Sequence, residues 1–191
     1  MVALVRFDSA GRWGETWVCD HLVSQELTRA GVHWGRWPLR PLVGDGLTEL
    51  KAVYGPELAA LGEDFPLRSA DRVAIAPDDS RWPEWRRQFL TEHQHSDAEI
   101  RFFLAGTGLF YIRDDDGFLG LLCEAGDWVA LPAGLPHCFD AGQEPQFDAI
   151  RLFSAADGWV AEPTGAPTPT LPLFDDFVGD LLARMDEAQE E

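Results

Sequence analysis

The chain has few cysteines, few basic residues and no long apolar run. Its three cysteines, Cys19, Cys123 and Cys138, form no C-x-x-C pair, which favours reduced thiols over a disulfide framework. Its 15 lysines and arginines are outnumbered by 33 acidic residues, and the net charge of -18 argues against nucleic acid or an anionic membrane surface as a partner. No stretch approaches the roughly 20 apolar residues of a membrane helix, and the apolar run from Met1 to Phe7 is too short for a signal peptide. We therefore expect a cytoplasmic protein.

The composition is that of a folded chain with a substantial core. Of its 191 residues, 46% are hydrophobic and 12% aromatic, which suits one domain with modest additions. We expect a single domain over 1–191, with an N-terminal helical decoration at 1–70, a β-barrel at 71–161, and an extended strap with an acidic helical tail at 162–191. The tail should form an amphipathic helix over about 175–187, after a segment rich in proline and threonine.

Helical periodicity is confined to the first half of the chain and the tail. Asp20 is expected to cap a helix that Gly31 ends, and a second helix is expected over 48–61 with an interruption at Gly55-Pro56. A third, short helix is expected over 83–88. These elements carry no evident chemistry, and we interpret them as packing elements.

Short β-like runs dominate the middle of the chain. They lie at 72–76, 100–105, 109–113, 118–124, 128–132 and 147–153. Turn signals such as Gly106-Thr107-Gly108 separate them about every 8 to 12 residues, which is typical of an antiparallel sandwich or barrel. The predicted fold class is therefore mainly β with flanking helices.

Histidine is scarce, and its distribution is uneven. Only five histidines occur, and two of them stand in the segment HQHSDAE at 93–99. Because side chains alternate between the faces of a strand, His93, His95, Glu99, Arg101 and Phe103 share one face if the segment stays extended. The segment would then present two imidazoles and one carboxylate together.

A third histidine, His137, ends the segment PAGLPH at 132–137, where a turn around Gly134 redirects the chain. Imidazoles and a carboxylate without thiolate suit Fe(II), Ni(II), Mn(II) or Zn(II), and four protein ligands on an octahedral ion leave two positions open for catalysis. A closed, structural zinc site is the alternative, but such sites generally use cysteine ligands. The remaining histidines, His21 and His33, have no ligand-like neighbours, and we interpret them as structural.

These two segments resemble the two cupin motifs. Within the cupin superfamily, the runs FLTEHQHSDAEIRFF (89–103), PHCFD (136–140) and IRLF (150–153) resemble the acireductone dioxygenase family. The resemblance extends to Gly31-Val32, Trp37-Pro38, Gly158-Trp159-Val160-Ala161 and Thr164-Gly165. It therefore covers the chain to about residue 165 and leaves out the acidic tail.

The resemblance implies a fold, a substrate and a cofactor. The fold is the cupin-type double-stranded β-helix, a jelly-roll barrel. The cofactor is one Fe(II) or Ni(II) per monomer, held by His93, His95, Glu99 and His137. The reaction belongs to methionine salvage and oxidises 1,2-dihydroxy-3-oxo-5-(methylthio)pent-1-ene, the acireductone, with dioxygen. Iron forms of the family give 4-methylthio-2-oxobutanoate and formate, whereas nickel forms give methylthiopropionate, formate and carbon monoxide.

Further residues receive roles from this resemblance and from their positions. Arg101 matches the arginine that stabilises the doubly deprotonated substrate, and the alternative for it is a surface ion pair. Arg151 is a candidate second anion contact. Ser96 and Asp97 are expected to orient a ligand histidine or to help the metal enter, whereas Glu92 is expected to be solvated. The candidates for an apolar wall that receives the methylthio tail and excludes water are Phe89, Phe103, Phe139 and Trp159.

Two other interpretations remain open at this point. Another small-molecule cupin dioxygenase or a sugar-modifying isomerase would use the same ligands with a different pocket. A non-catalytic, ligand-binding cupin would have no need for an open metal position. The ligands accept iron and nickel alike, so the native metal is undecided, and we expect a monomer.

Overall fold

The computed structural model describes residues 2–155, 160–167 and 170–190. The strands in this part of the chain are β1 (Ala3–Asp8), β2 (Trp13–Trp17), β3 (His33–Arg36), β4 (Ser69–Ile75), β5 (His93–Gln94), β6 (Glu99–Arg113), β7 (Gly117–Glu124), β8 (Asp127–Leu131), β9 (His137–Asp140), β10 (Phe147–Phe153) and β11 (Glu162–Pro163). The helices are α1 (Asp20–Arg29), α2 (Leu47–Asp64), α3 (Trp82–Leu90) and α4 (Phe174–Glu190). None of these helices is both long and apolar enough to cross a membrane.

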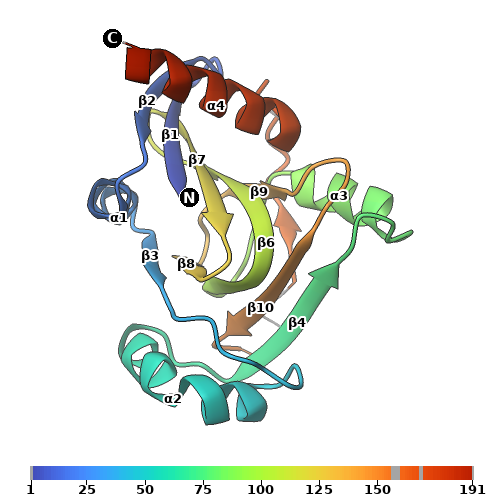
Figure 1. Ribbon diagram of the computed structural model, residues 1–191. Helices are drawn as coiled ribbons and strands as arrows, with labels where there is room; N and C mark the ends of the chain where they lie inside the picture. The colour runs from blue at the N-terminus through green and yellow to red at the C-terminus, as the bar shows by residue number, and fades with distance from the viewer. Residues whose placement is uncertain (1, 156–159, 168–169, 191) are drawn as a thin grey trace.

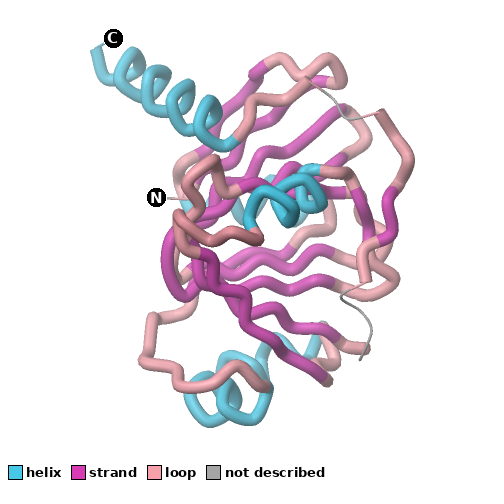
Figure 2. The backbone as a smooth tube through the Cα atoms, turned by 90° about the vertical axis from the view of Figure 1, so that its right-hand side faces the viewer, coloured by secondary structure: helices cyan, strands magenta, loops and turns pink. Residues whose placement is uncertain are grey.

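The strands form two antiparallel sheets that share β6 (Figures 1 and 2). The first sheet has the order β2-β1-β7-β6-β9-β5-β11, and the second has the order β3-β8-β6-β10-β4. The N-terminal half of β6 pairs with β8 and β10, and its C-terminal half pairs with β7 and β9. The prediction of a mainly β fold with flanking helices is confirmed, although the described strands do not close into a complete barrel.

The prediction of a turn at Gly106-Thr107-Gly108 is wrong, because strand β6 runs through these residues. The pairing of β6 with β10 skips Leu104, since Asp148 lies opposite Ala105 and Ala149 opposite Phe103. This irregularity, followed by Gly106 at φ +72°, bends the strand from one sheet into the other. Such a bulge also shifts the alternation of side chains by one residue.

Among the glycines of the strands, Gly106 should tolerate an added side chain least. A Cβ there would lie 1.8 Å from the Gln146 carbonyl oxygen, in addition to the strain of its positive φ. We expect Gly106→Ala to lower the free energy of unfolding by about 3 kcal/mol, measured by urea denaturation. The control is Gly31→Ala, at φ +73° with no atom within 4 Å of the added Cβ, which should cost about 1 kcal/mol. Equal losses in the two variants would contradict this account.

The main core fills the space between the two sheets and includes side chains of α1 and α3, whereas α2 and α4 cover the outer faces. Residues such as Phe110 and Leu121 from the first sheet meet Val129 and Phe147 from the second. In Figure 1, α2 lies below the second sheet and α4 above the first, with α1 and α3 at opposite sides. The predicted tail helix is confirmed as α4, which buries Phe177 against the outer face of the first sheet.

The first 70 residues contain more than the expected helices. They also provide β1, β2 and β3, which the expected helical decoration did not include. Residues 3–5 of β1 are buried, because one face meets the main core and the other meets α4. A strand buried on both faces shows no apolar and polar alternation, so its signal is weak. The three-part division of a single domain stays a prediction.

The N-cap of α1 differs from the prediction, whereas the interruption in α2 matches it. Cys19, not Asp20, is the N-cap of α1, and it makes no side-chain capping bond. Asp20 is instead the first helical residue, where its charge favours the positive end of the helix dipole. The interruption in α2 is confirmed, since Tyr54 adopts non-helical angles two residues before Pro56, whose ring crowds the preceding turn.

Candidate metal centre

Four side chains converge in a pocket beside β5 and β9. His93, His95, Glu99 and His137 each offer one ligand atom, and these atoms lie within 4.8 Å of one another. All four residues are buried. His93 on β5 lies opposite His137 on β9, Glu99 begins β6, and His95 lies on the link between β5 and β6. The structure thus brings together the residues that the two sequence segments singled out.

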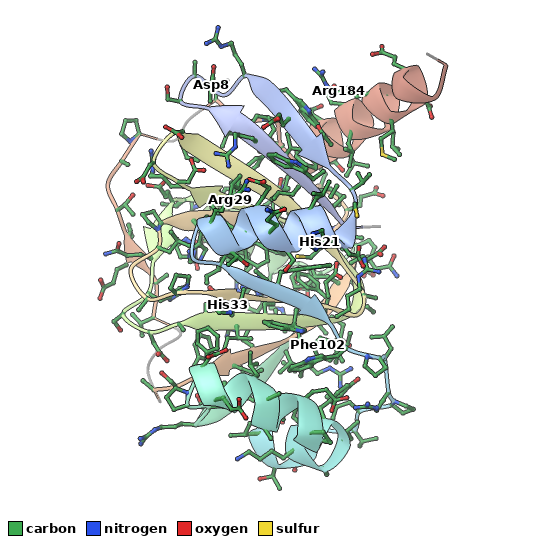
Figure 3. The ribbon with its side chains drawn as sticks, turned by 90° about the vertical axis from the view of Figure 1, so that its left-hand side faces the viewer. Asp8, His21, Arg29, His33, Phe102 and Arg184 are labelled. Atoms are coloured by element: carbon green, nitrogen blue, oxygen red, sulfur yellow. The ribbon has the colours of Figure 1, made fainter. Side chains whose placement is uncertain are left out.

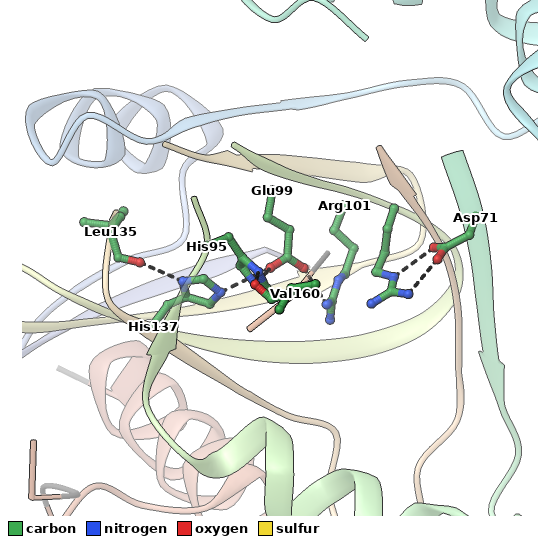
Figure 4. Close-up of polar contacts among 8 residues, drawn as sticks. Asp71, His95, Glu99, Arg101, Leu135, His137 and Val160 are labelled. Atoms are coloured by element: carbon green, nitrogen blue, oxygen red, sulfur yellow. Dashed lines mark hydrogen bonds and ion pairs between the residues drawn. The ribbon is translucent and has the colours of Figure 1, made fainter. Parts of the chain in front are cut away.

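Backbone carbonyls orient all three imidazoles, and Figure 4 shows those of His95 and His137 with their partners. The Nδ1 atoms lie 2.7 Å from the oxygen of Thr91 for His93, 3.0 Å from that of Val160 for His95, and 2.8 Å from that of Leu135 for His137. A carbonyl oxygen only accepts hydrogen bonds, so each Nδ1 carries the proton and each Nε2 keeps its lone pair. Orientation by an oxygen was expected, but Ser96 and Asp97 do not provide it.

The remaining atoms of the cluster fit a cation. Oε2 of Glu99 lies 3.0 Å from Nε2 of His95 and 3.2 Å from Nε2 of His137. With the protons on Nδ1, lone pairs face one another across these distances. Among the described residues, the buried Nε2 of His95 has no hydrogen-bond partner of good geometry. Either added protons or a metal ion must lie between these atoms, and the donor set is one that divalent transition metals accept.

The surroundings tune the charges of the cluster. Burial, together with nearby His137, lowers the pKa of His93 to about 4. Burial opposes the charged form of His95, but the adjacent carboxylate of Glu99 favours that form more strongly and raises the pKa of His95. Burial would raise the pKa of Glu99, yet the charge of Arg101 and the two imidazoles hold it well below its usual range. The centre therefore combines an ionised carboxylate with a neutral His93 near neutral pH.

Arg101 lies against the cluster and is 5% exposed, which excludes the surface ion pair. Its Nη2 donates to Oε1 of Glu99 at 2.6 Å, so the two oxygens of Glu99 serve different partners. Its guanidinium carbon lies 4.5 Å from the ring centre of Phe139 and 5.1 Å from that of Phe110. Within the described part of the chain, its buried Nε has no hydrogen-bond partner. The pocket thus contains a buried guanidinium whose Nε is an unused donor.

The pocket around these groups has a volume of about 450 Å³ and a largely apolar wall. Besides the four ligands and Arg101, its lining residues are Val73, Trp85, Gln88, Phe89, Phe110, Phe139, Arg151, Val160 and Ala161. Phe89 and Phe139 are where the sequence analysis expected them. Phe103 does not line the pocket and packs instead in the main core, and Trp159 lies outside the described residues.

Six lining residues were not predicted from the sequence: Val73, Trp85, Gln88, Phe110, Val160 and Ala161. Phe110 lies nine residues after Arg101, which regular alternation would place on the opposite face. The bulge at Leu104 reverses that phase and brings Phe110 inward, opposite Phe139. Val73 and Trp85 come from β4 and α3, and no local pattern connects either residue to the ligands.

Arg151 lines the pocket but already has a partner. Its Nε and Nη2 donate to the two oxygens of Asp71 at 2.8 and 2.6 Å, drawn in Figure 4. This bidentate pair offsets its charge and fixes its direction. Any contact between Arg151 and an anionic ligand would therefore come from a guanidinium that Asp71 positions.

Of the three residues that lie between or beside the ligands in sequence, Asp97 and Glu92 bond to neighbouring segments of the chain. Ser96 is exposed, whereas Asp97 accepts bonds from the backbone nitrogens of Ser154 and Ala155 and from the Ser154 hydroxyl. The expectation that Glu92 is solvated is wrong, because it is 7% exposed. Its oxygens accept from Arg113 and Thr164.

The other two histidines lie outside the pocket lining. Figure 3 shows His21 on α1 and His33 on β3. The ring of His33 packs edge-on against Phe65, consistent with a structural role. All three cysteines are free.

Known proteins are similar to this chain in sequence and in fold. The ARD/ARD' family model matches residues 62–161. The acireductone dioxygenase of Marinobacter nauticus is 40% identical over 82% of this chain and 86% of its own, and acireductone dioxygenase 1 of Nocardia farcinica is 41% identical over 82% and 87%. The structure of an acireductone dioxygenase from Bacillus anthracis with a cadmium ion in its active centre is 27% identical, covers 83% of this chain and 96% of that one, and superimposes with a TM-score of 0.72. The chain therefore belongs to the acireductone dioxygenase family, which has the cupin fold.

Proposed function

We propose that this protein cleaves the acireductone 1,2-dihydroxy-3-oxo-5-(methylthio)pent-1-ene with dioxygen, as a metal-dependent enzyme of methionine salvage. The observation that carries the proposal is the pairing of a four-ligand cluster with Arg101 in one apolar pocket. Family membership supports the reaction, and the separation of the two Glu99 oxygens, one toward His95 and His137 and one toward Arg101, supports the site.

The proposed cofactor is one Fe(II) or Ni(II) ion per monomer. Three imidazoles and one carboxylate suit either ion and leave two neighbouring positions of an octahedron. When bound, the metal would supply Lewis-acid stabilisation of the negative charge on the enediolate. By the family resemblance, iron would lead to 4-methylthio-2-oxobutanoate and formate, and nickel to methylthiopropionate, formate and carbon monoxide.

Arg101 would attract and hold the anionic substrate in a protein whose net charge is -18. A divalent ion with one carboxylate carries a net charge of about +1, and the guanidinium adds another positive charge in a buried setting where attraction is strong. The unused Nε of Arg101 is a donor for a substrate oxygen. Ser96 and Asp97 would assist metal entry, and Arg151 would be a second anion contact.

The apolar wall would receive the methylthio tail and exclude water. Phe89 and Phe139 flank Arg101, and Val73 and Trp85 extend the wall away from the ligands. Exclusion of water protects reactive oxygenated species from diversion. We further propose that the chain acts as a cytoplasmic, single-domain monomer.

Reconstitution with two metals tests this function. Metal-free protein is loaded with Fe(II) or with Ni(II) and supplied with the acireductone and oxygen, and the products are separated and quantified. We expect keto acid and formate with iron, and methylthiopropionate, formate and carbon monoxide with nickel. Protein without metal should give neither set above the uncatalysed background. The absence of all these products with both metals would refute the proposal.

A further inference from the structure

The three histidines of the cluster are not oriented in the same way. His93 and His137 bond through Nδ1 to the carbonyls of Thr91 and Leu135, each two residues earlier in the chain. Local backbone geometry is enough to place these oxygens. His95 instead bonds to the carbonyl of Val160, 65 residues later. Its orientation therefore depends on how the segment at 160–164 is attached.

Backbone pairing attaches this segment only weakly. The strand β11 consists of Glu162 and Pro163, which pair with Gln94 and His93 of β5. Proline has no N–H to donate, so this two-residue ladder is incomplete. Both residues of β11 are exposed, and packing adds little. A further attachment is needed to hold the Val160 carbonyl in place.

Glu92 provides that attachment. One of its oxygens, Oε1, accepts from the Thr164 hydroxyl at 2.6 Å, and its backbone carbonyl accepts from the Thr164 nitrogen at 3.1 Å. Its other oxygen, Oε2, accepts from Nε of Arg113 at 2.8 Å. A buried carboxylate is tolerated only with such charge-assisted bonds. These bonds join the segment to β5 on one side and to the end of β6 on the other.

We propose that Glu92 is a positioning residue for the metal centre, which latches Thr164 so that the carbonyl of Val160 holds His95 with its Nε2 toward the other ligands. The inference rests on the proposed function, since it concerns the same metal centre. Groups that orient metal ligands by hydrogen-bonding to them commonly contribute 10- to 100-fold to metal affinity. The latch acts one step further from the metal, so its contribution should lie near the lower end of that range.

The variant Thr164→Val tests the latch without touching a ligand or its neighbours in sequence. It keeps the shape of the side chain and removes the hydroxyl, and with it the bond to the Glu92 carboxylate and the bond accepted from the Ala166 nitrogen. Affinity for Ni(II) is measured on metal-free, full-length protein by competition with a chelator, and the visible spectrum of the Co(II)-loaded protein reports ligand geometry. We expect Thr164→Val to weaken Ni(II) binding about 10-fold and to alter the Co(II) spectrum. Glu92→Gln should do the same or more.

Two controls separate positioning from general stability. Thr164→Ser retains the hydroxyl and should restore the wild-type affinity and spectrum. Thr28→Val removes a hydroxyl bond to Ser24 on the exposed face of α1 and should leave both unchanged. A lower melting temperature of Thr164→Val with unaltered Ni(II) affinity and Co(II) spectrum would overturn the latch alone. Failure of the wild-type protein to bind either metal would overturn the proposed function as well.

Discussion

Replacing Arg101 by methionine should leave the metal content unchanged and lower kcat/KM by about 10²- to 10³-fold, the effect of removing one preorganised donor from a buried anion site. Arg101 is 5% exposed and its guanidinium packs on the rings of Phe139 and Phe110, so methionine can occupy the same apolar space. What disappears is the positive charge and the unused Nε donor. Elemental analysis and steady-state kinetics on the same preparation measure both quantities.

The matched control for Arg101 is another paired arginine outside the pocket lining. Arg72 bonds to Asp148 through two nitrogens, and Arg72→Met should keep kcat/KM within about twofold, because a partly exposed pair contributes little beyond local stability. Arg101→Met with wild-type kcat/KM at full metal occupancy would contradict the assigned role. Loss of metal from Arg101→Met would instead show that the arginine acts on the ligands through Glu99.

Replacing Glu99 by glutamine should abolish metal retention and, with it, turnover. The change removes the only anionic ligand of the cluster, and a neutral amide cannot face Arg101 and the two imidazoles equally well with a single oxygen. In the metal-free variant the buried Arg101 loses its counter-ion, which should lower the free energy of unfolding by about 3–5 kcal/mol. Elemental analysis measures the first effect and urea denaturation the second.

A surface carboxylate serves as the control for this substitution. Glu84 on α3 pairs with Arg87 in an exposed setting, and Glu84→Gln should keep full metal content and change stability by less than about 1 kcal/mol. Stoichiometric metal in purified Glu99→Gln would exclude Glu99 as a required ligand. An unaltered unfolding midpoint would show that Arg101 finds another partner when the carboxylate is removed.

The ligand set could be predicted because its signal is local. Three of the four ligands fall within seven residues, so one short segment carries most of the signal although residues 95–98 form a link between β5 and β6. The fourth ligand, His137, follows a glycine turn whose direction can be inferred. Arg101 continues the strand alternation from Glu99, and the structure keeps that phase. The predicted β runs coincide with strands, although 100–105 and 109–113 belong to the single strand β6, because buried strands in the middle of the chain are rich in β-branched and aromatic residues.

What could not be predicted depends on contacts between distant segments. The face of β6 on which Phe110 lies depends on a bulge in the pairing of β6 with β10. No residue near Phe110 in sequence indicates that bulge. Glu92 looked solvated because its partners, Arg113 and Thr164, lie 21 and 72 residues away. The strand β1 was missed because its burial on both faces requires α4, from the opposite end of the chain.

The sharing of β6 between the sheets has a consequence for the lifetime of the protein. His93 and His137 belong to the first sheet, whereas Glu99 lies on the part of β6 that pairs with β8 in the second. An ion bound to all of them acts as a cross-link between the two layers and binds only when both are assembled. A free metal concentration 100 times the dissociation constant would add about 2.7 kcal/mol of stability by mass action. Metal scarcity would then expose the chain to proteolysis, so its abundance in the cell would follow the supply of its own cofactor.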